Sequence, residues 1–331
     1  MIFSQPSNTA GSAVRFGIVL SAGNGTRLQE FVRQRRGEDL PKQYVNFVGR
    51  RSMLEHTWDR AESLIPAQRL IVVVAKEHLR LSEVHRQLAT KPPTSLVVQP
   101  ANKETAPGIL LPLLHVYKRQ PDAIVALFPS DHFVLDEERF MNHVDRAFRI
   151  VEAEPSRLVL LGLEPDAPDP EYGYIVPGNK LDALQLESAR QVEMFVEKPS
   201  TKVAEKIIDR GALWNTMVMV FACATLLSVI RRAAPDLHRA FEPIQNALGT
   251  AEEQQVIEQV YRKLPSLNFS TGILEMLPFE HRQALLVLPV RGVTWSDWGT
   301  VDRLSSMLDR LRAGDARQES AVPETARLRV A

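Results

Sequence analysis

A short glycine-containing segment carries residue types that suit phosphate binding. Gly23 and Gly25 follow an apolar run at 16–20, and they let the backbone approach an anion with its N–H groups exposed. Arg27 adds a planar cationic fork and Lys42 a mobile point charge. We therefore expect a triphosphate site formed by Ser21, Ala22, Gly23, Asn24, Gly25, Thr26, Arg27 and Lys42. The alternative is a strand-to-helix turn with two surface cations.

Two carboxylates follow the ends of apolar strands. Asp131 lies in Pro-Ser-Asp-His after the run 123–128, and Asp297 lies in Trp-Ser-Asp-Trp-Gly after the run 284–289. Ligands of open α/β sheets bind beyond the carboxyl ends of strands, where carboxylates hold Mg²⁺ against phosphates. We expect Asp131 and Asp297 to share one Mg²⁺. The alternatives are a helix cap at Asp131 and an exposed turn at Asp297.

A third group of residues suits a hydroxyl-rich ligand. Gly173 lies in Glu-Tyr-Gly-Tyr, Glu197 and Lys198 lie in Val-Glu-Lys-Pro, and Asn215 follows Trp214. Carboxylates and amides supply the acceptors and donors that sugar hydroxyls require. We expect Gly173, Glu197, Lys198 and Asn215 to contact a sugar. A surface ion pair between Glu197 and Lys198 is the alternative.

The elements that must position these motifs alternate between apolar strands and helices. In the first half they are expected at 16–20, 53–65, 69–75, 79–89, 95–99, 106–119 and 123–128. Strands that are apolar on both faces and alternate with helices require cover on both sides of the sheet. We predict an α/β fold with a Rossmann-like mixed, mostly parallel sheet and helices on both faces.

The second half is less regular, and no linker divides the chain. Strands are expected at 158–162, 173–176, 192–197, 217–221 and 284–289, and helices at 202–210, 226–233, 237–248, 252–264 and 301–311. We predict a single domain over 15–312 with a helical insertion near 225–265. A loose arm is expected at 1–14, and a disordered tail at 313–331.

Composition narrows the classes of partner. The 331 residues include 40 basic and 40 acidic side chains, so no global basic field favours nucleic acid. Cys223 is the single cysteine, which suits a reducing compartment. The sequence has no apolar stretch long enough to span a membrane. We expect a cytoplasmic protein without nucleic-acid or membrane partners.

Taken in order, the motifs resemble those of the sugar-nucleotide pyrophosphorylases, and within them the mannose-1-phosphate guanylyltransferases. The resemblance extends over residues 15–310. The family motifs G-x-G-T-R, P-K-Q, T-A-P, P-x-D-H, E-K-P, W-N and W-S-D-x-G stand at 23–27, 41–43, 105–107, 129–132, 197–199, 214–215 and 295–299.

This resemblance implies transfer of a nucleotidyl group from GTP to a hexose 1-phosphate, with mannose 1-phosphate expected, giving GDP-sugar and pyrophosphate. The implied catalytic residues are Arg27, Lys42, Asp131 and Asp297, the last two as Mg²⁺ ligands. Thr105, Ala106 and Pro107 are implied to face the base. A homodimer is a candidate assembly. We expect no isomerase domain of the kind that longer bifunctional relatives carry.

Several positions depart from the family pattern. Ala22 stands for glycine, Glu104 for asparagine, Thr216-Met217 for Ser-Gly and Ser270 for aspartate, and the stretch 28–40 is unusually charged. A pyrophosphorylase for another sugar or base is therefore an alternative. A non-catalytic regulatory relative is a second, against which the four catalytic residues argue. A dinucleotide-dependent oxidoreductase is a third, but the loop lacks G-x-G-x-x-G.

Overall fold

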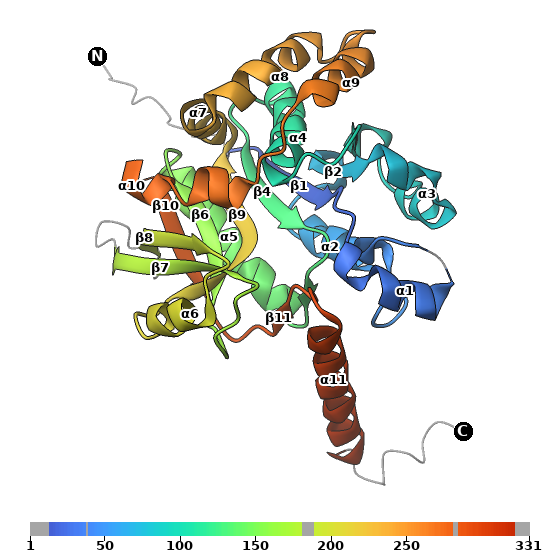
Figure 1. Ribbon diagram of the computed structural model, residues 1–331, viewed down its shortest axis with the longest axis vertical. Coiled ribbons are helices and arrows are strands. Elements are labelled where there is room, and N and C mark those ends of the chain that lie inside the picture. Colours follow the sequence, from blue (N-terminus) through green and yellow to red (C-terminus); the bar gives the residue numbers. More distant parts are fainter. Residues whose placement is uncertain (1–12, 38, 181–188, 281–283, 322–331) are drawn as a thin grey trace, which may run out of the picture.

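A nine-stranded sheet forms the centre of the protein (Figure 1). The computed structural model describes residues 13–37, 39–180, 189–280 and 284–321. The strands of this sheet are β1 (Arg15–Ser21), β2 (Leu70–Ala75), β3 (Leu96–Gln99), β4 (Ile124–Pro129), β6 (Leu158–Leu163), β7 (Gly173–Lys180), β8 (Arg190–Glu197), β9 (Leu213–Ala222) and β10 (Leu285–Val290).

Strand direction agrees with the predicted topology. The order across the sheet is β3-β2-β1-β4-β9-β6-β10-β8-β7. β8 and β9 run against the other seven strands. Every residue of β2 and β4 is buried, which requires layers on both faces because successive side chains point to opposite sides. The prediction of a mixed, mostly parallel sheet is confirmed.

Two hydrophobic clusters cover the two faces. Val19 of β1 belongs to one cluster, with side chains of α2 (Met53–Glu62) and α5 (Glu137–Ala153). Its neighbour Ile18 belongs to the other, with side chains of α4 (Thr105–Arg119) and α7 (Cys223–Ala233). The prediction of helices on both faces is confirmed.

Apart from α1 and α10, which were not predicted, the remaining helices follow the predicted order with some differences in length. They are α1 (Gln29–Arg36), α3 (Ser82–Leu88), α6 (Thr201–Ile208), α8 (Pro235–Ala247), α9 (Glu253–Lys263), α10 (Leu277–Glu280) and α11 (Val301–Ala321). Helices α7, α8 and α9 occupy the region of the expected helical insertion and lie together at the top of Figure 1. Among the described helices, none has the length and hydrophobicity needed to cross a membrane.

Three element predictions need correction. The helix expected at 301–311 continues to Ala321, because the following stretch is rich in Ala, Arg, Gln and Glu, which favour helix. The strand expected from Met217 begins at Leu213, so Trp214 and Asn215 are strand residues. Helices α1, α5 and α10 were not predicted. Of the predicted arm and tail, residues 1–12 and 322–331 lie outside the described residues.

A small second sheet joins the two carboxylate motifs. β5 (Phe133–Val134) pairs in antiparallel fashion with β11 (Trp295–Ser296). Asp131 lies just before β5 and Asp297 just after β11. Pairing of two strands so distant in sequence therefore brings both carboxylates to one place at the carboxyl ends of the central strands.

Candidate active site

The loop after β1 is held from behind by the Pro-Lys-Gln segment. Gln43 Nε2 donates to the carbonyl oxygens of Ser21 at 3.0 Å and Gly23 at 2.7 Å. Gly25 has φ +59°, and a Cβ there would lie 3.1 Å from the backbone nitrogen of Lys42. A side chain at this position would strain the backbone and crowd Lys42, so the loop geometry requires glycine.

Lys42 connects the two carboxylate motifs. Its side chain is only 6% exposed, and Nζ lies 2.8 Å from Oδ2 of Asp131. The same ammonium group donates to the backbone carbonyl of Asp297 at 2.5 Å. A buried charge needs such partners because its desolvation is costly. The structure thus brings together three of the four predicted catalytic residues.

Asp131 is ionised at neutral pH. Burial of the carboxyl group opposes ionisation, but the Lys42 ammonium, the charge of His132 and the hydrogen bonds to the carboxylate together outweigh it and lower the pKa of Asp131 to about 2. Its side chain remains 39% exposed. Nε2 of His132 lies 3.6 Å from Asp131 Oδ1, and the imidazole packs edge-on against Trp295. Burial lowers the pKa of His132, so its ring is neutral at pH 7.

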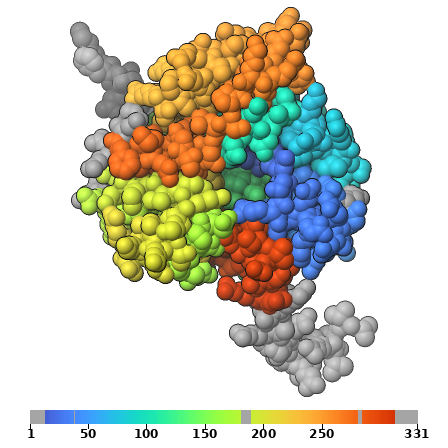
Figure 2. All heavy atoms as spheres, in the orientation of Figure 1, coloured from blue at the N-terminus to red at the C-terminus, as the bar shows by residue number. Residues whose placement is uncertain are grey.

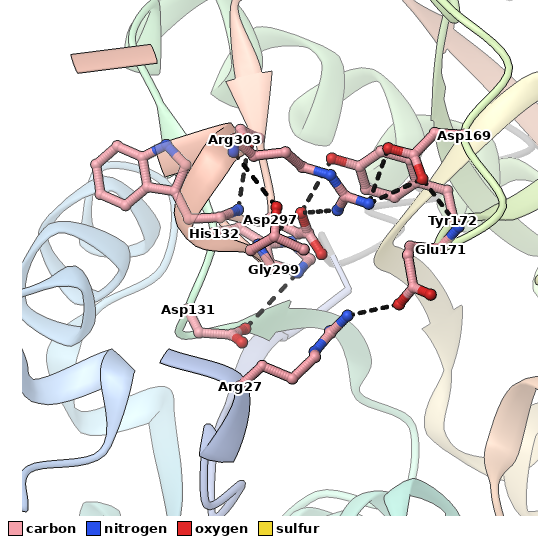
Figure 3. Close-up of polar contacts among 12 residues, drawn as sticks. Arg27, Asp131, His132, Asp169, Glu171, Tyr172, Asp297, Gly299 and Arg303 are labelled. Atoms are coloured by element: carbon pink, nitrogen blue, oxygen red, sulfur yellow. Dashed lines mark hydrogen bonds and ion pairs between the residues drawn. The ribbon is translucent and has the colours of Figure 1, made fainter. Parts of the chain in front are cut away.

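Asp297 is fixed by partners that the sequence did not identify (Figure 3). Its Oδ1 accepts hydrogen bonds from the Tyr172 hydroxyl at 2.9 Å and from Arg303 Nη1 at 2.7 Å. Arg303 Nη2 in turn lies 2.8 Å from a carboxylate oxygen of Asp169. Although burial opposes ionisation, the charges of His132, Lys42 and Arg303 together lower the pKa of Asp297. The only indication in the sequence that Arg303 contacts this site was its position in the first helical turn after Trp-Ser-Asp-Trp-Gly.

Arg27 stands at the opening of the cleft. Its Nη1 lies 2.7 Å from Oε2 of Glu171, and both side chains are about half exposed. A cavity of about 370 Å³ is lined by Asn24, Gly25, Thr26, Arg27, Leu28, Lys42, Asn102, Asp131, Trp298 and Gly299. Figure 2 shows a hollow at the centre of this face, where blue, yellow-green and orange segments meet. Most predicted triphosphate residues therefore share one cleft with a candidate metal ligand.

A second cavity, of about 190 Å³, adjoins the first and shares Asn102 with it. It is lined by Leu20, Ala22, Gly23, Val73, Gln99, Asn102, Glu104, Thr105 and Gly108. The Thr105 hydroxyl accepts a hydrogen bond from the Phe269 N–H at 2.7 Å. Ala106 and Pro107 are buried and do not line the cavity. Of the three predicted base-facing residues, only Thr105 lines the cavity.

Three of the predicted sugar-binding residues meet on adjacent strands. Gly173 of β7 is paired with Glu197 of β8. A Cβ on Gly173 would lie 2.6 Å from Glu197 Oε2 and 3.5 Å from Cβ of Asn215, so a side chain there would displace the Glu197 carboxylate. Lys198 is exposed beside them, and its N–H donates to the Tyr172 carbonyl at 3.1 Å.

The departures at Met217 and Ser270 contact each other beside this group. Ser270 Oγ lies 3.6 Å from Sδ of Met217, whose φ is +55°. Glu275, which the sequence did not identify, accepts a hydrogen bond from the Glu197 N–H at 2.8 Å. Burial, together with the charge of Glu275, raises the pKa of Glu197 against the opposing effects of Lys198 and Ser270.

The two aspartates fit Mg²⁺ by the chemistry of their oxygens. Both carboxyl groups are ionised at neutral pH, and Asp131 is open to the cleft. Among the described residues, Asp297 Oδ2 accepts no hydrogen bond. Groups of three or more metal-binding side chains are also absent from the described part of the chain. Two carboxylates suit Mg²⁺, which takes its remaining ligands from phosphates and water.

A buried arginine supports the aspartate loop from outside the cleft. Arg60 of α2 is 4% exposed, and its Nη2 donates to the His132 carbonyl at 3.1 Å and to Thr57 Oγ1 at 2.7 Å. Its Nη1 lies 3.5 Å from Glu137 Oε1, which is also 3.2 Å from Nδ1 of His56. Burial lowers the pKa of Arg60 to about 10, so it is cationic at neutral pH.

Sequence comparison assigns this fold and cleft to a known family. The model of the nucleotidyl transferase family matches residues 16–313, and the chain belongs to this family. The xanthan biosynthesis protein XanB of Xanthomonas campestris is 31% identical over 88% of this chain. A mannose-1-phosphate guanylyltransferase of Escherichia coli is 27% identical over 85% of it.

Solved structures give the same result. A structure described as a mannose-1-phosphate geranyltransferase from Thermus thermophilus is 30% identical, with a TM-score of 0.70, and covers 86% of this chain and 76% of that one. The chain spans 58% of the length of XanB and 59% of the Escherichia coli protein. The resemblance drawn from the motifs is therefore confirmed at the level of the family.

Proposed function

We propose that the chain transfers a guanylyl group from GTP to mannose 1-phosphate and releases pyrophosphate, with Mg²⁺ as cofactor. The observation that carries this proposal is the position of Lys42, which joins Asp131 and Asp297 at the side of the glycine loop. Two ionised carboxylates, two cations and exposed loop N–H groups in one cleft suit a reaction between two anions.

The reaction needs no base to create its nucleophile, because a sugar phosphate is ionised at neutral pH. One phosphate oxygen forms a bond to the α-phosphorus while the bond from that phosphorus to the bridging oxygen breaks, and pyrophosphate departs with the electron pair. Arg27 and Lys42 offset the negative charge that grows on the leaving group. Binding of triphosphate requires Arg27 to exchange Glu171 for phosphate oxygens.

Asp131 and Asp297 are the residues that would hold Mg²⁺. When bound there, the ion supplies Lewis-acid polarisation and charge neutralisation at the phosphates. Arg303 and Tyr172 keep the Asp297 carboxylate oriented, and Arg60 keeps the loop of Asp131 in place through the carbonyl of His132. Such positioning contributes much of the rate in phosphoryl transfer.

Base and sugar preferences rest on separate features. The relatives named for mannose 1-phosphate and guanylyl transfer support both substrates. Glu104 lines the smaller cavity, where a carboxylate can accept hydrogen bonds from guanine N1–H and the 2-amino group. Glu197 and Asn215 supply polar contacts for a sugar.

The single buried cysteine supports our further proposal of a cytoplasmic location. A homodimer stays a prediction.

A substrate panel tests this proposal. Pyrophosphate release is measured with GTP, ATP, UTP or dTTP against mannose 1-phosphate or glucose 1-phosphate, with and without Mg²⁺. We expect release that requires Mg²⁺ and is fastest with GTP and mannose 1-phosphate. Equal rates with UTP or dTTP would overturn the base, and preference for glucose 1-phosphate would overturn the sugar. Absence of release from every pair would favour a non-catalytic role.

A further inference from the structure

Arg36 and Leu40, from the unusually charged stretch between Arg27 and Lys42, line a separate cavity. This cavity has a volume of about 300 Å³ and lies among α1, α2 and α3. It is lined by Arg36, Leu40, Tyr44, Asn46, Arg50, Ser52, Glu55, Ser82, Glu83 and Arg86. We call it the arginine pocket. None of these residues lines the triphosphate or base cavity, so the proposed reaction leaves the pocket unexplained.

Positive charge in the arginine pocket exceeds what its carboxylates neutralise. Glu83 forms an ion pair with Arg86, whose Nε and Nη2 donate to the two carboxylate oxygens at 2.9 and 2.6 Å. Glu55 accepts a hydrogen bond from the backbone N–H of Ser52 at 2.7 Å and lies 3.9 Å from Nη1 of Arg86. Arg36 and Arg50 are exposed and form no ion pair within the described part of the chain, although Arg36 also acts electrostatically on Glu83. Three arginines against two carboxylates leave an excess of positive charge, which suits a phosphate group that arginine binds in bidentate fashion.

The pocket shares a wall with the active site. The short helix η2 (Lys42–Tyr44) carries Lys42, which contacts Asp131, and Tyr44, which lines the arginine pocket. The Tyr44 hydroxyl donates to the carbonyl of Ser21 in the glycine loop at 3.0 Å. Buried Gln87 connects the two sides, because its Nε2 donates to the Tyr44 carbonyl at 2.9 Å and to a carboxylate oxygen of Glu83 at 2.8 Å.

We propose that the arginine pocket is an effector site for a small phosphomonoester, held by Arg36, Arg50 and Arg86, whose binding alters the affinity of the glycine loop for nucleotide. An anion that draws Arg86 away from Glu83 also disturbs the hydrogen bonds from Gln87 to Glu83 and Tyr44. Tyr44 transmits this change to the carbonyl of Ser21. The effect on nucleotide rests on the proposed function, whereas binding of the anion does not.

Binding is tested with inorganic phosphate by isothermal titration calorimetry on the full chain. We expect two sites, one at the triphosphate loop and one in the arginine pocket. The double variant Arg36→Ala with Arg50→Ala should lose one site, and Lys42→Ala should lose the other. Arg35→Ala with Arg80→Ala is a matched control, since it removes two exposed charges that do not line the pocket and should retain both sites.

Coupling is tested by the Kd of GTP with and without saturating phosphate. Competition at the triphosphate loop occurs in every variant, so the informative quantity is the difference between the full chain and the double variant. We expect a difference of at least about fivefold, the lower end of typical allosteric coupling. Unchanged phosphate stoichiometry in the double variant would overturn the site. Loss of one site with an unchanged GTP response would overturn its role as an effector site.

Substitution of Arg36 and Arg50 by lysine keeps the charge and checks that loss of binding is not loss of folding. This variant should retain phosphate binding with weaker affinity, because a point charge cannot form the two-pronged contact. Failure of the lysine variant to bind while its circular dichroism is unchanged would contradict a site in which positive charge holds the anion. If the chain bound phosphate in the pocket yet released no pyrophosphate, the proposed function would fail and this site would stand.

Discussion

At the scale of single residues, the two aspartates interact with different partners. Asp131 neutralises buried Lys42, whereas Asp297 holds Arg303 and Tyr172. We predict that Asp131→Asn and Asp297→Asn each lower kcat at least about 100-fold, roughly 2.7 kcal/mol of barrier, because either change removes one proposed Mg²⁺ ligand. Turnover at saturating Mg²⁺ is the measurement, with circular dichroism to verify folding. Near-normal turnover in either variant would exclude that residue from the metal site.

Glu197, a proposed sugar ligand, should lower the stability of the fold at neutral pH. Burial raises its pKa in the folded protein, so its favourable contribution is full below the unfolded pKa and is lost as pH rises through the folded value. We predict that Glu197→Gln raises the free energy of unfolding at pH 7, and that this gain vanishes below about pH 4, where both states are protonated. The KM for sugar 1-phosphate should increase. Urea unfolding at both pH values measures the free energy of unfolding of the variant and of the unaltered chain. A larger stabilisation of the variant at the acidic pH would contradict the prediction.

At the scale of elements, the pairing of β5 with β11 and the support from α2 fix the aspartate loop. Arg60→Ala should lower the free energy of unfolding by about 1–3 kcal/mol, because the His132 carbonyl and the buried Thr57 hydroxyl lose their hydrogen-bond donor. It should also lower kcat roughly 10- to 100-fold with little change in the KM for nucleotide, as expected from misplacement of a reacting group. Both quantities are measured at a temperature where the variant is folded.

A cavity of about 440 Å³ between α2 and α5 is lined by Arg60, so added guanidinium should restore part of the lost turnover. Arg51→Ala is the control, because Arg51 lines the same cavity but pairs with exposed Asp59. If Arg60→Ala kept full kcat once folded, the arginine would be structural only.

The sequence predicted the central strands well, because an apolar run buried on both faces is a strong local pattern. It also predicted that Lys42, Asp131 and Asp297 gather at the cleft, since parallel strands end at the same edge, but Ala106 and Pro107 do not line the base cavity. Helix α5 was missed although Phe140, Val144 and Phe148 stand at helical spacing, so its signal was present. The bond between Tyr172 and Asp297 could not be foreseen, because it joins residues 125 positions apart and depends on how two strands turn toward the cleft.

At the scale of the whole molecule, the cleft lies between a half that carries the glycine loop and a half that carries β7, β8 and β9. The ion pair between Arg27 and Glu171 spans this opening (Figure 3). The pair is exposed on both sides, so it contributes little to stability. The ion pair should instead weaken the binding of nucleotide, because Arg27 must leave Glu171 before it can contact a triphosphate.

Release of this contact should favour the nucleotide. We predict that Glu171→Gln lowers the Kd for GTP by up to about fivefold, since an exposed pair is worth at most about 1 kcal/mol. The gain should shrink as ionic strength rises and screens the pair in the unaltered chain. Asp59→Asn is the control, because it breaks an equally exposed pair with Arg51 away from the triphosphate cleft and should leave the Kd unchanged. A weaker affinity in Glu171→Gln would mean instead that Glu171 holds Arg27 in the position from which it binds phosphate.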